Sequence, residues 1–269
     1  MDLFLREMGE GPPILCLHGH PGSSDSMAVF GRSLGEKYRV LMPDLRGYGR
    51  STVDSSFIMA DHLDDLATLL NQRNINQCIV LGWSLGGIIA MELALRFPNR
   101  VTGLILVATA ARPRGAHPRT QWHELLFTMI AALLNQAMPG WQWNIDTFAR
   151  RSLFKYLVHR QEPATYRYVA ESAIASTLRT SKYAHQALNT AMRQGYNRMP
   201  ELAQITQPCW IGAGQYDVHI TAASTKETAD HLPNADWREY HDVAHLFPWE
   251  IPDQLLADIN HWLNQNFPV

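Results

Sequence analysis

The chain has 269 residues, of which 46% are hydrophobic and 18% are charged, and its formal net charge at pH 7 is −2. A chain of this length and composition can bury a substantial core, which argues against a disordered protein. The near-neutral charge gives no reason to expect a nucleic-acid partner. No run of about 18 apolar residues is present to span a bilayer, and the N-terminus lacks the pattern of a secretory signal, so we expect a cytoplasmic protein.

Short apolar runs alternate along the chain with longer segments that have helical spacing. This alternation predicts an α/β fold, in which a mostly parallel sheet carries helices on both faces. We expect strands at residues 14–17, 38–42, 78–81, 104–107, 209–211 and 237–240, and helices at 60–70, 85–97 and 251–267. The three cysteines, Cys16, Cys78 and Cys209, lie in the apolar runs, so we expect buried free thiols and no metal site.

The alternation stops after residue 107. Residues 111–200 offer helical stretches at 122–137, 145–158 and 166–179 and no convincing strand, which predicts a helical insertion between two parts of the core, residues 1–110 and 201–269. The insertion has 12 Lys and Arg against 4 Asp and Glu, a net charge of +8, while the rest of the chain has a net charge of −10. This asymmetry indicates either a surface for an anionic partner or a solvated helical face.

The motif with most chemical content is Gly-Trp-Ser-Leu-Gly-Gly at residues 82–87. Gly-x-Ser-x-Gly between a strand and a helix makes a sharp turn that exposes the serine, although the pattern alone also fits a plain glycine-rich bend. Here the expected strand precedes the motif and the expected helix follows it. The sequence therefore favours Ser84 as a nucleophile that needs a base and an acid later in the chain.

Candidates for the acid and the base each follow a later strand. Asp217 comes after the strand at 209–211, and His245 comes after the strand at 237–240, so Ser84, Asp217 and His245 have the expected order. His241 is the rival base, but it closes its strand. Asp242 and Asp236 are weaker acids, because neither follows a separate core strand. Backbone N–H groups of His20 and Leu85 are the expected oxyanion donors, although the loop at 18–24 also fits a plain turn.

Together these motifs resemble the α/β-hydrolase fold family over nearly the whole chain. Besides the serine turn, the chain matches the family's His-Gly-x segment at residues 18–20 and its Asp-x-x-Gly-x-Gly-x-Ser segment at residues 44–51. The resemblance implies that residues 111–200 form a lid over the active site. It also implies a Ser-His-Asp mechanism without a metal or organic cofactor.

The branch of the family is less sharply indicated. The His-Gly-x-Pro segment is similar to that of epoxide hydrolases and haloalkane dehalogenases, but Ser84 argues against both, because those enzymes use an aspartate nucleophile. Proline iminopeptidases also share the segment, but they have Trp after the serine, where this chain has Leu85, which argues against amide cleavage. The serine turn resembles that of pimeloyl-carrier-protein methyl ester esterases, whose basic lid meets an acidic carrier protein. Cofactor-free perhydrolases and carbon–carbon bond hydrolases share the core motifs.

We therefore expect a serine carboxylesterase that acts on a small-molecule ester with a medium apolar or aromatic acyl group. Trp83, Trp141 and Trp143 are the candidate substrate-binding residues, while most apolar lid residues are expected to pack the lid on the core. An acidic carrier protein at the basic lid, a perhydrolase and a carbon–carbon bond hydrolase are the alternatives. From another class, the chain could be a ligand receptor or interaction protein that retains a hydrolase core.

Overall fold

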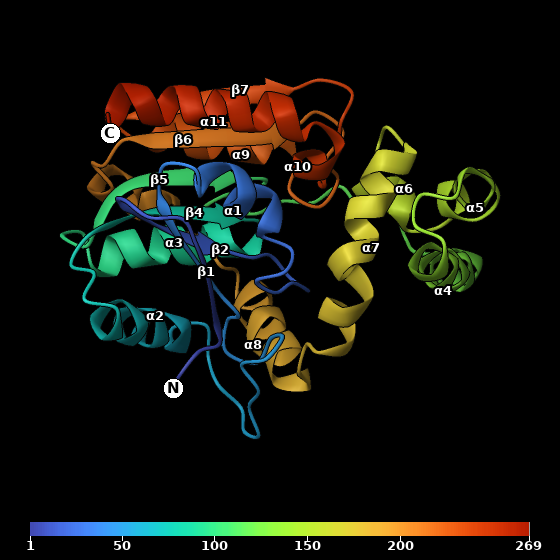
Figure 1. Cartoon of the computed structure of the whole chain (residues 1–269), viewed down its shortest axis with the longest axis horizontal. Coiled ribbons are helices and arrows are strands. Elements are labelled where there is room, and N and C mark those ends of the chain that lie inside the picture. The colour runs from blue at the N-terminus through green and yellow to red at the C-terminus, as the bar shows by residue number, and fades with distance from the viewer. Residues whose placement is uncertain (269) are drawn as a thin grey trace.

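The computed structural model describes residues 1–268, with the backbone only at 172 and 173, and centres on a seven-stranded sheet (Figure 1). The strand order is β1-β3-β2-β4-β5-β6-β7, in which β1 runs antiparallel to β3 and the other neighbours are parallel. The strands are β1 (Leu5–Met8), β2 (Pro13–Leu17), β3 (Arg39–Pro43), β4 (Cys78–Trp83), β5 (Val101–Val107), β6 (Cys209–Gly214) and β7 (Ala235–Tyr240).

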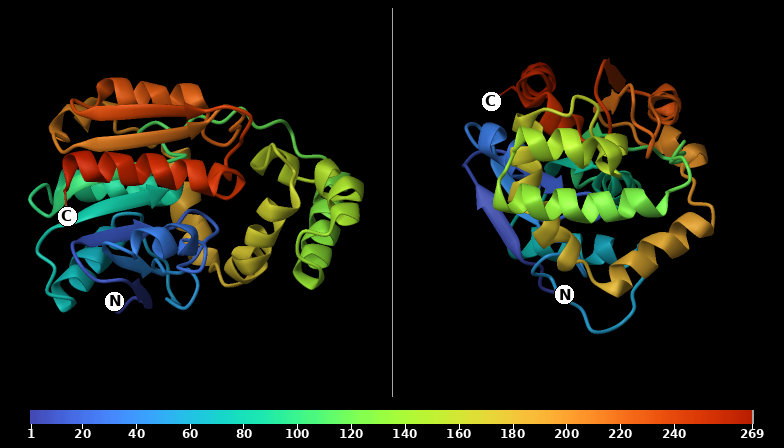
Figure 2. Two further views of the ribbon diagram at one scale, coloured as in Figure 1. Left: turned by 45° about the horizontal axis from the view of Figure 1, so that its top comes forward. Right: turned by 90° about the vertical axis from the view of Figure 1, so that its right-hand side faces the viewer.

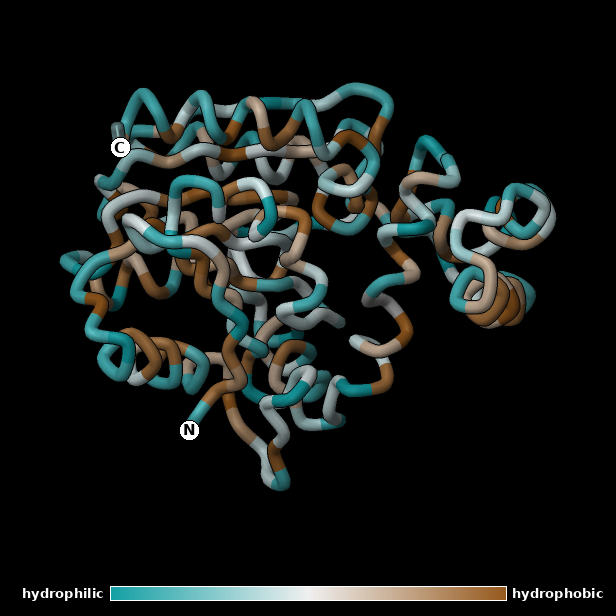
Figure 3. Tube along the Cα trace, viewed as in Figure 1, coloured by the Kyte–Doolittle hydropathy of each residue, from teal (hydrophilic) through white to brown (hydrophobic). Residues whose placement is uncertain are grey.

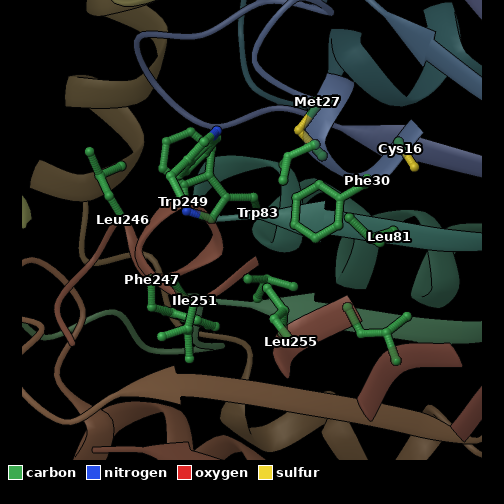
Figure 4. Close-up of a cluster of buried hydrophobic side chains, with 14 of the residues drawn as sticks. Cys16, Met27, Phe30, Leu81, Trp83, Leu246, Phe247, Trp249, Ile251 and Leu255 are labelled. Atoms are coloured by element: carbon green, nitrogen blue, oxygen red, sulfur yellow. The ribbon is translucent and has the colours of Figure 1, made fainter. Parts of the chain in front are cut away.

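Helices cover both faces of this sheet because the central strands bury side chains in both directions. Ile79 and Leu81 of β4 belong to one apolar cluster, with α1 (Ala28–Leu34) and α11 (Pro252–Asn266), and part of that cluster is drawn in Figure 4. Val80 belongs to the other cluster, with α2 (Asp61–Gln72), α3 (Leu85–Arg96) and α9 (Ala222–His231). Apolar runs without alternation are typical of such doubly covered strands.

Residues 111–200 contain no strand within the described chain and form a helical insertion. Its elements are α4 (Trp122–Ala137), α5 (Gln142–Thr147), η1 (Ala149–Arg151), α6 (Phe154–Leu157), α7 (Pro163–Leu178) and α8 (Lys182–Arg193). Helices α4 to α7 project to one side of the core, with α4 and α5 outermost (Figures 1 and 2). Helix α8 instead packs on the core through Ala184 and Leu188.

The expected α/β architecture is confirmed, and most expected elements lie within a few residues of their predicted bounds. Two short stretches, η2 (Met199–Gln204) and α10 (Phe247–Glu250), complete the fold. The predicted helix at 145–158 is wrong, because the segment breaks into α5, η1 and α6. Ser152 explains one break: its hydroxyl accepts from the Phe154 N–H and donates to the Ala149 carbonyl, in competition with helical bonding.

The cysteines are buried free thiols, as expected, and burial raises the pKa of Cys78 and Cys209 to about 12. Among the described residues, no helix is both long and apolar enough to cross a membrane.

Candidate active site

Ser84 lies at the turn between β4 and α3, at the carboxyl edge of the sheet. Its backbone has φ 54° and ψ −116°, a strained conformation for a residue other than glycine. The turn closes because glycines stand on either side: a Cβ at Gly82 would overlap the Gly86 carbonyl, and one at Gly86 would overlap the Leu17 carbonyl. The sequence therefore makes a tight elbow that holds the Ser84 hydroxyl away from the sheet.

His245 and Asp217 extend a hydrogen-bonded chain from this serine. The Ser84 Oγ lies 3.1 Å from His245 Nε2, and His245 Nδ1 lies 2.7 Å from Asp217 Oδ2. Because Asp217 can only accept when ionised, Nδ1 carries the proton and a neutral imidazole presents Nε2 as an acceptor to the serine. The structure thus brings together the three residues that were predicted to act as nucleophile, base and acid.

The surroundings of Asp217 fix its carboxylate. Its Oδ1 accepts the backbone N–H groups of His219 at 2.8 Å and Ile220 at 3.0 Å, and the side chain is buried. The His219 ring lies 5.2 Å from the His245 ring, and burial lowers the pKa of His219 to about 4. A neutral His219 places no positive charge beside His245. The rival candidates His241, Asp242 and Asp236 are exposed and form no part of this chain of hydrogen bonds.

The loop after β2 approaches the serine from the other side. A Cβ on Gly19 would lie 2.7 Å from the Trp83 ring and 3.1 Å from the Ser84 Cβ, so this close approach requires glycine. No residue of the described chain accepts from the backbone N–H of His20 or of Leu85. These N–H groups, which the sequence predicted as oxyanion donors, remain available to a ligand.

The ring of His20 is a neutral group at this site. Burial, and secondarily its neighbours His185 and His18, lower the pKa of His20 to about 4. Its Nδ1 lies 2.9 Å from the Tyr48 hydroxyl, a contact that sequence reasoning missed although Tyr48 lies inside the 44–51 motif.

Two buried polar residues hold the loops of the site in place. His18 Nδ1 lies 2.8 Å from the Gly19 carbonyl, and His18 Nε2 accepts the Leu45 N–H at 3.0 Å, which links the loops after β2 and β3. Asp44 accepts the N–H groups of Ser24 at 2.6 Å and Arg50 at 2.7 Å. The residues of both sequence motifs therefore shape the loops beside the serine.

A cavity of about 560 Å³ opens beside Ser84, between the core and the insertion. Among the described residues its lining contains no Asp, Glu, Lys or Arg side chain. The core contributes His20, Trp83 and His245, and α4 and α7 contribute most of the apolar wall through residues such as Met129 and Val169. Such a site suits an uncharged, largely apolar group.

The three predicted substrate-binding tryptophans are placed differently. Trp83 lines the cavity and packs against Trp249, with ring centroids 4.7 Å apart (Figure 4). Trp141 and Trp143 do not line it: their rings contact each other in a tilted arrangement with centroids 4.8 Å apart, and they are 36% and 51% exposed. They belong to the outer α5 segment, and nothing in their local sequence reveals on which side of α4 this segment lies.

Sequence reasoning also missed Glu250, which lies on α10. Its buried carboxylate accepts the N–H groups of His159 at 2.9 Å, Arg160 at 2.7 Å and Ala244 at 2.8 Å. Desolvation raises the pKa of Glu250. The Leu246 N–H adds a bond to the Leu157 carbonyl at 2.9 Å, so the loop that carries His245 is tied directly to the insertion.

The arrangement is that of the α/β-hydrolase class: a strained serine at a strand-to-helix turn is hydrogen-bonded to a histidine, which is in turn bonded to an aspartate, and both partners lie in loops after later strands. The family model for the alpha/beta hydrolase fold matches residues 12–252, so the chain belongs to this family and is a hydrolase of α/β fold. The resemblance read from the sequence motifs is confirmed. No group of three or more His, Cys, Asp and Glu residues in the described chain is arranged to hold a metal ion.

Individual relatives are distant. The pimeloyl-[acyl-carrier protein] methyl ester esterase of Vibrio campbellii is 31% identical over 147 residues, which cover 55% of each chain. The enzyme of the same name from Nitrosomonas europaea is 24% identical over 95% of this chain and 97% of its own. The chain thus spans only about half the length of the first of these relatives. A thermophilic esterase from Thermogutta terrifontis has the same fold, with a TM-score of 0.72, 24% identity, and coverage of 98% of this chain and 93% of its own.

Proposed function

We propose that this protein is a carboxylesterase that hydrolyses esters with an uncharged apolar acyl group through an acyl-enzyme. The observation that carries the proposal is the chain of hydrogen bonds from Ser84 through His245 to Asp217 beside a cavity lined without charged side chains. A serine so activated attacks an acyl carbon, and an apolar wall favours an apolar acyl group through removal of its surface from water.

The proposed mechanism follows from the observed hydrogen bonds. His245 Nε2 takes the proton as the Ser84 oxygen attacks the ester carbonyl, and Asp217 stabilises the imidazolium that forms. The N–H groups of His20 and Leu85 donate to the oxyanion of the tetrahedral intermediate. His245 then protonates the leaving alcohol, activates water against the acyl-enzyme and returns the proton to Ser84.

The segment from α4 to α7 is the proposed lid. It supplies most of the apolar cavity wall, and its position above the carboxyl edge of the sheet lets it exclude water from the acyl-enzyme. The cytoplasmic location suggested by the sequence stays a prediction.

Hydrolysis of p-nitrophenyl esters of increasing acyl length tests this proposal. We expect Ser84→Ala to abolish turnover and labelling by a fluorophosphonate, while Ser55→Ala, on an exposed core loop, retains both. Activity that survives in Ser84→Ala would contradict the assigned nucleophile. A wild-type protein that neither turns over nor labels would favour the receptor class, and specific cleavage of a carbon–carbon bond or peracid formation would favour the other enzymatic alternatives.

A carrier-linked acyl ester is the second candidate substrate. The names of the relatives and the net charge of +8 on residues 111–200 favour it, because acidic carriers are attracted to a basic surface. Salt-dependent binding of an acidic acyl carrier protein tests this candidate. Absence of binding at low salt would remove it and leave the small-molecule ester proposal intact.

A further inference from the structure

Helix α4 and the segment that follows it carry a group of exposed apolar side chains. Of twelve large hydrophobic side chains exposed in the described part of the molecule, eight lie between residues 122 and 143. Five of them are on α4 and are 40–75% exposed. Their helical spacing places them on one side, which we call the α4 face: Trp122, Leu125, Leu126, Met129 and Leu133. A contiguous exposed apolar patch is typical of an interaction surface.

Polar anchors on the opposite side of α4 hold this face outward. The buried Glu124 accepts the Gln121 N–H at 2.7 Å and the Tyr156 hydroxyl at 3.0 Å. The buried Asn135 donates to the Tyr166 carbonyl at 2.7 Å and accepts the Gly140 N–H at 2.9 Å. Rotation of α4 to bury its apolar face would leave these polar groups without partners, at a cost of about 1–3 kcal/mol each. The outward orientation is therefore built into the helix.

Helix α4 itself belongs to the part of the insertion farthest from the sheet. Figure 2 shows α4 and α5 turned away from the sheet, and in Figure 3 the α4 tube is strongly hydrophobic at the far right of the view. Leu125, Met129 and Leu133 belong both to the α4 face and to the cavity lining. The apolar surface is thus continuous with the cavity.

The insertion also carries exposed cations that make no ion pair within the described chain. Arg151, on η1 packed against α4, and Arg167, on α7, are exposed and have no ion pair in the described chain. Arg119, three residues before α4, and Arg179, just after α7, are also exposed and have no ion pair with a described residue. Of the four acids in residues 111–200, three are paired: Glu124 with Lys155, Asp146 with Arg150 and Glu171 with Arg32; Glu162 has no ion pair with a described residue.

We propose that the α4 face docks on an anionic lipid bilayer, with α4 lying in the plane of the interface. An exposed apolar helix face that begins with a tryptophan, in an insertion that carries unpaired cations, suits a surface made of acyl chains and anionic headgroups. A second copy of the chain is disfavoured as the occupant, because symmetric pairing would bring the unpaired arginines of both copies together. An acidic protein would satisfy the arginines but would need an apolar face of its own to cover α4.

Sedimentation with phospholipid vesicles tests the proposal, and Ser84→Ala is used as the background so that lipid hydrolysis cannot interfere. We expect binding to vesicles that contain phosphatidylglycerol, weaker binding to phosphatidylcholine alone, and weakening by salt. Trp122→Ser with Leu126→Ser, which removes two apolar side chains outside the cavity lining, should lower the partition constant at least about tenfold. Arg119→Gln, three residues before the start of α4, should lower it about fivefold.

The matched control is Ile58→Ser, which removes a side chain that is 64% exposed on the core. Ile58→Ser should bind vesicles like the parent. The double variant Trp122→Ser with Leu126→Ser, made in the protein that keeps Ser84, should hydrolyse a soluble ester at the parent rate, which would show that this variant folds. Equal binding of all variants, no binding to anionic vesicles at low salt, or concentration-dependent dimerisation through the α4 face without vesicle binding would overturn the proposal. Vesicle binding is measured in the Ser84→Ala protein, so its result does not depend on the proposed esterase activity.

Discussion

At the scale of single residues, the site depends on which atom of His245 carries the proton. Asp217 Oδ2 accepts from His245 Nδ1 at 2.7 Å, while Asp217 Oδ1 is occupied by two backbone N–H groups. The backbone therefore fixes the orientation of the carboxylate through Oδ1, which leaves Oδ2 to accept from His245. This arrangement leaves Nε2 without a proton, as required of a base for Ser84.

Asp217→Asn should move the proton of the neutral His245 ring from Nδ1 to Nε2, with little change in the shape of the side chain at position 217. The amide oxygen can still accept the two backbone N–H groups, so its NH₂ group faces His245 and favours the tautomer with the proton on Nε2. We expect kcat to fall by about 10³–10⁴-fold with a small change in KM, measured on a p-nitrophenyl ester. Asp242→Asn and Asp236→Asn, at exposed positions, are the controls. A comparable loss in either control, or full activity in Asp217→Asn, would contradict the assignment.

The sequence could predict how Ser84, Asp217 and His245 meet, because parallel strands end at the same edge of a sheet and each residue follows a strand. It could not predict that Trp141 and Trp143 lie outside the cavity lining, since this depends on how α5 packs on α4. The same applies to Glu250, whose partners His159 and Arg160 lie about 90 residues away in sequence.

At the scale of elements, Glu250 joins three parts of the molecule: α10, the segment between α6 and α7, and the loop that carries His245. Glu250→Ala should leave three N–H groups without acceptors and destabilise the protein by about 2–4 kcal/mol in urea unfolding. It should also lower kcat, because the His245 loop loses its connection to the insertion. Glu250→Gln, which keeps one acceptor oxygen, should fall between the parent and Glu250→Ala.

Glu162→Ala is the matched control for this experiment, because Glu162 is exposed and its side chain makes no cap at the start of α7. Its effect on the free energy of unfolding should stay within about 0.5 kcal/mol. If Glu250→Ala unfolds at the same urea concentration as Glu162→Ala, the hydrogen bonds of Glu250 contribute nothing measurable to the free energy of unfolding.

Elements buried on both sides were predictable, because their apolar runs follow directly from burial in a parallel sheet. Strand β1 was not: its sequence Leu-Arg-Glu-Met is half-exposed at the sheet edge, and only its pairing with β3 makes it a strand. The break in the segment at 145–158 was hidden for a similar reason, since it comes from the local bonding of Ser152 and tertiary contacts rather than from a helix breaker such as proline.

At the scale of the whole molecule, buried and half-buried histidines link stability to pH. Burial is the first cause that lowers the pKa of His20, His62 and His219 to about 4, from the ordinary value of 6.5. These residues come from different parts of the fold: the loop after β2, helix α2 and the loop after β6. Between pH 6.5 and 4 the unfolded chain therefore binds protons at these positions that the native protein does not bind.

The free energy of unfolding should accordingly be greatest above pH 6.5 and fall as the pH is lowered toward 4. For each such histidine the slope approaches about 1.4 kcal/mol per pH unit within this window. His62 allows this prediction to be tested without disturbing the active site, because it packs against Tyr48 and Phe57, outside the hydrogen-bonded chain of Ser84, His245 and Asp217. Urea unfolding at several pH values measures how the free energy of unfolding changes with pH. In His62→Phe this change should be smaller by up to about 1.4 kcal/mol per pH unit. The two proteins are compared first at pH 8, where an imidazole is neutral in both states, so that any packing change is measured separately. An unchanged slope in His62→Phe would show that His62 is protonated in the native protein at the same pH as in the unfolded chain.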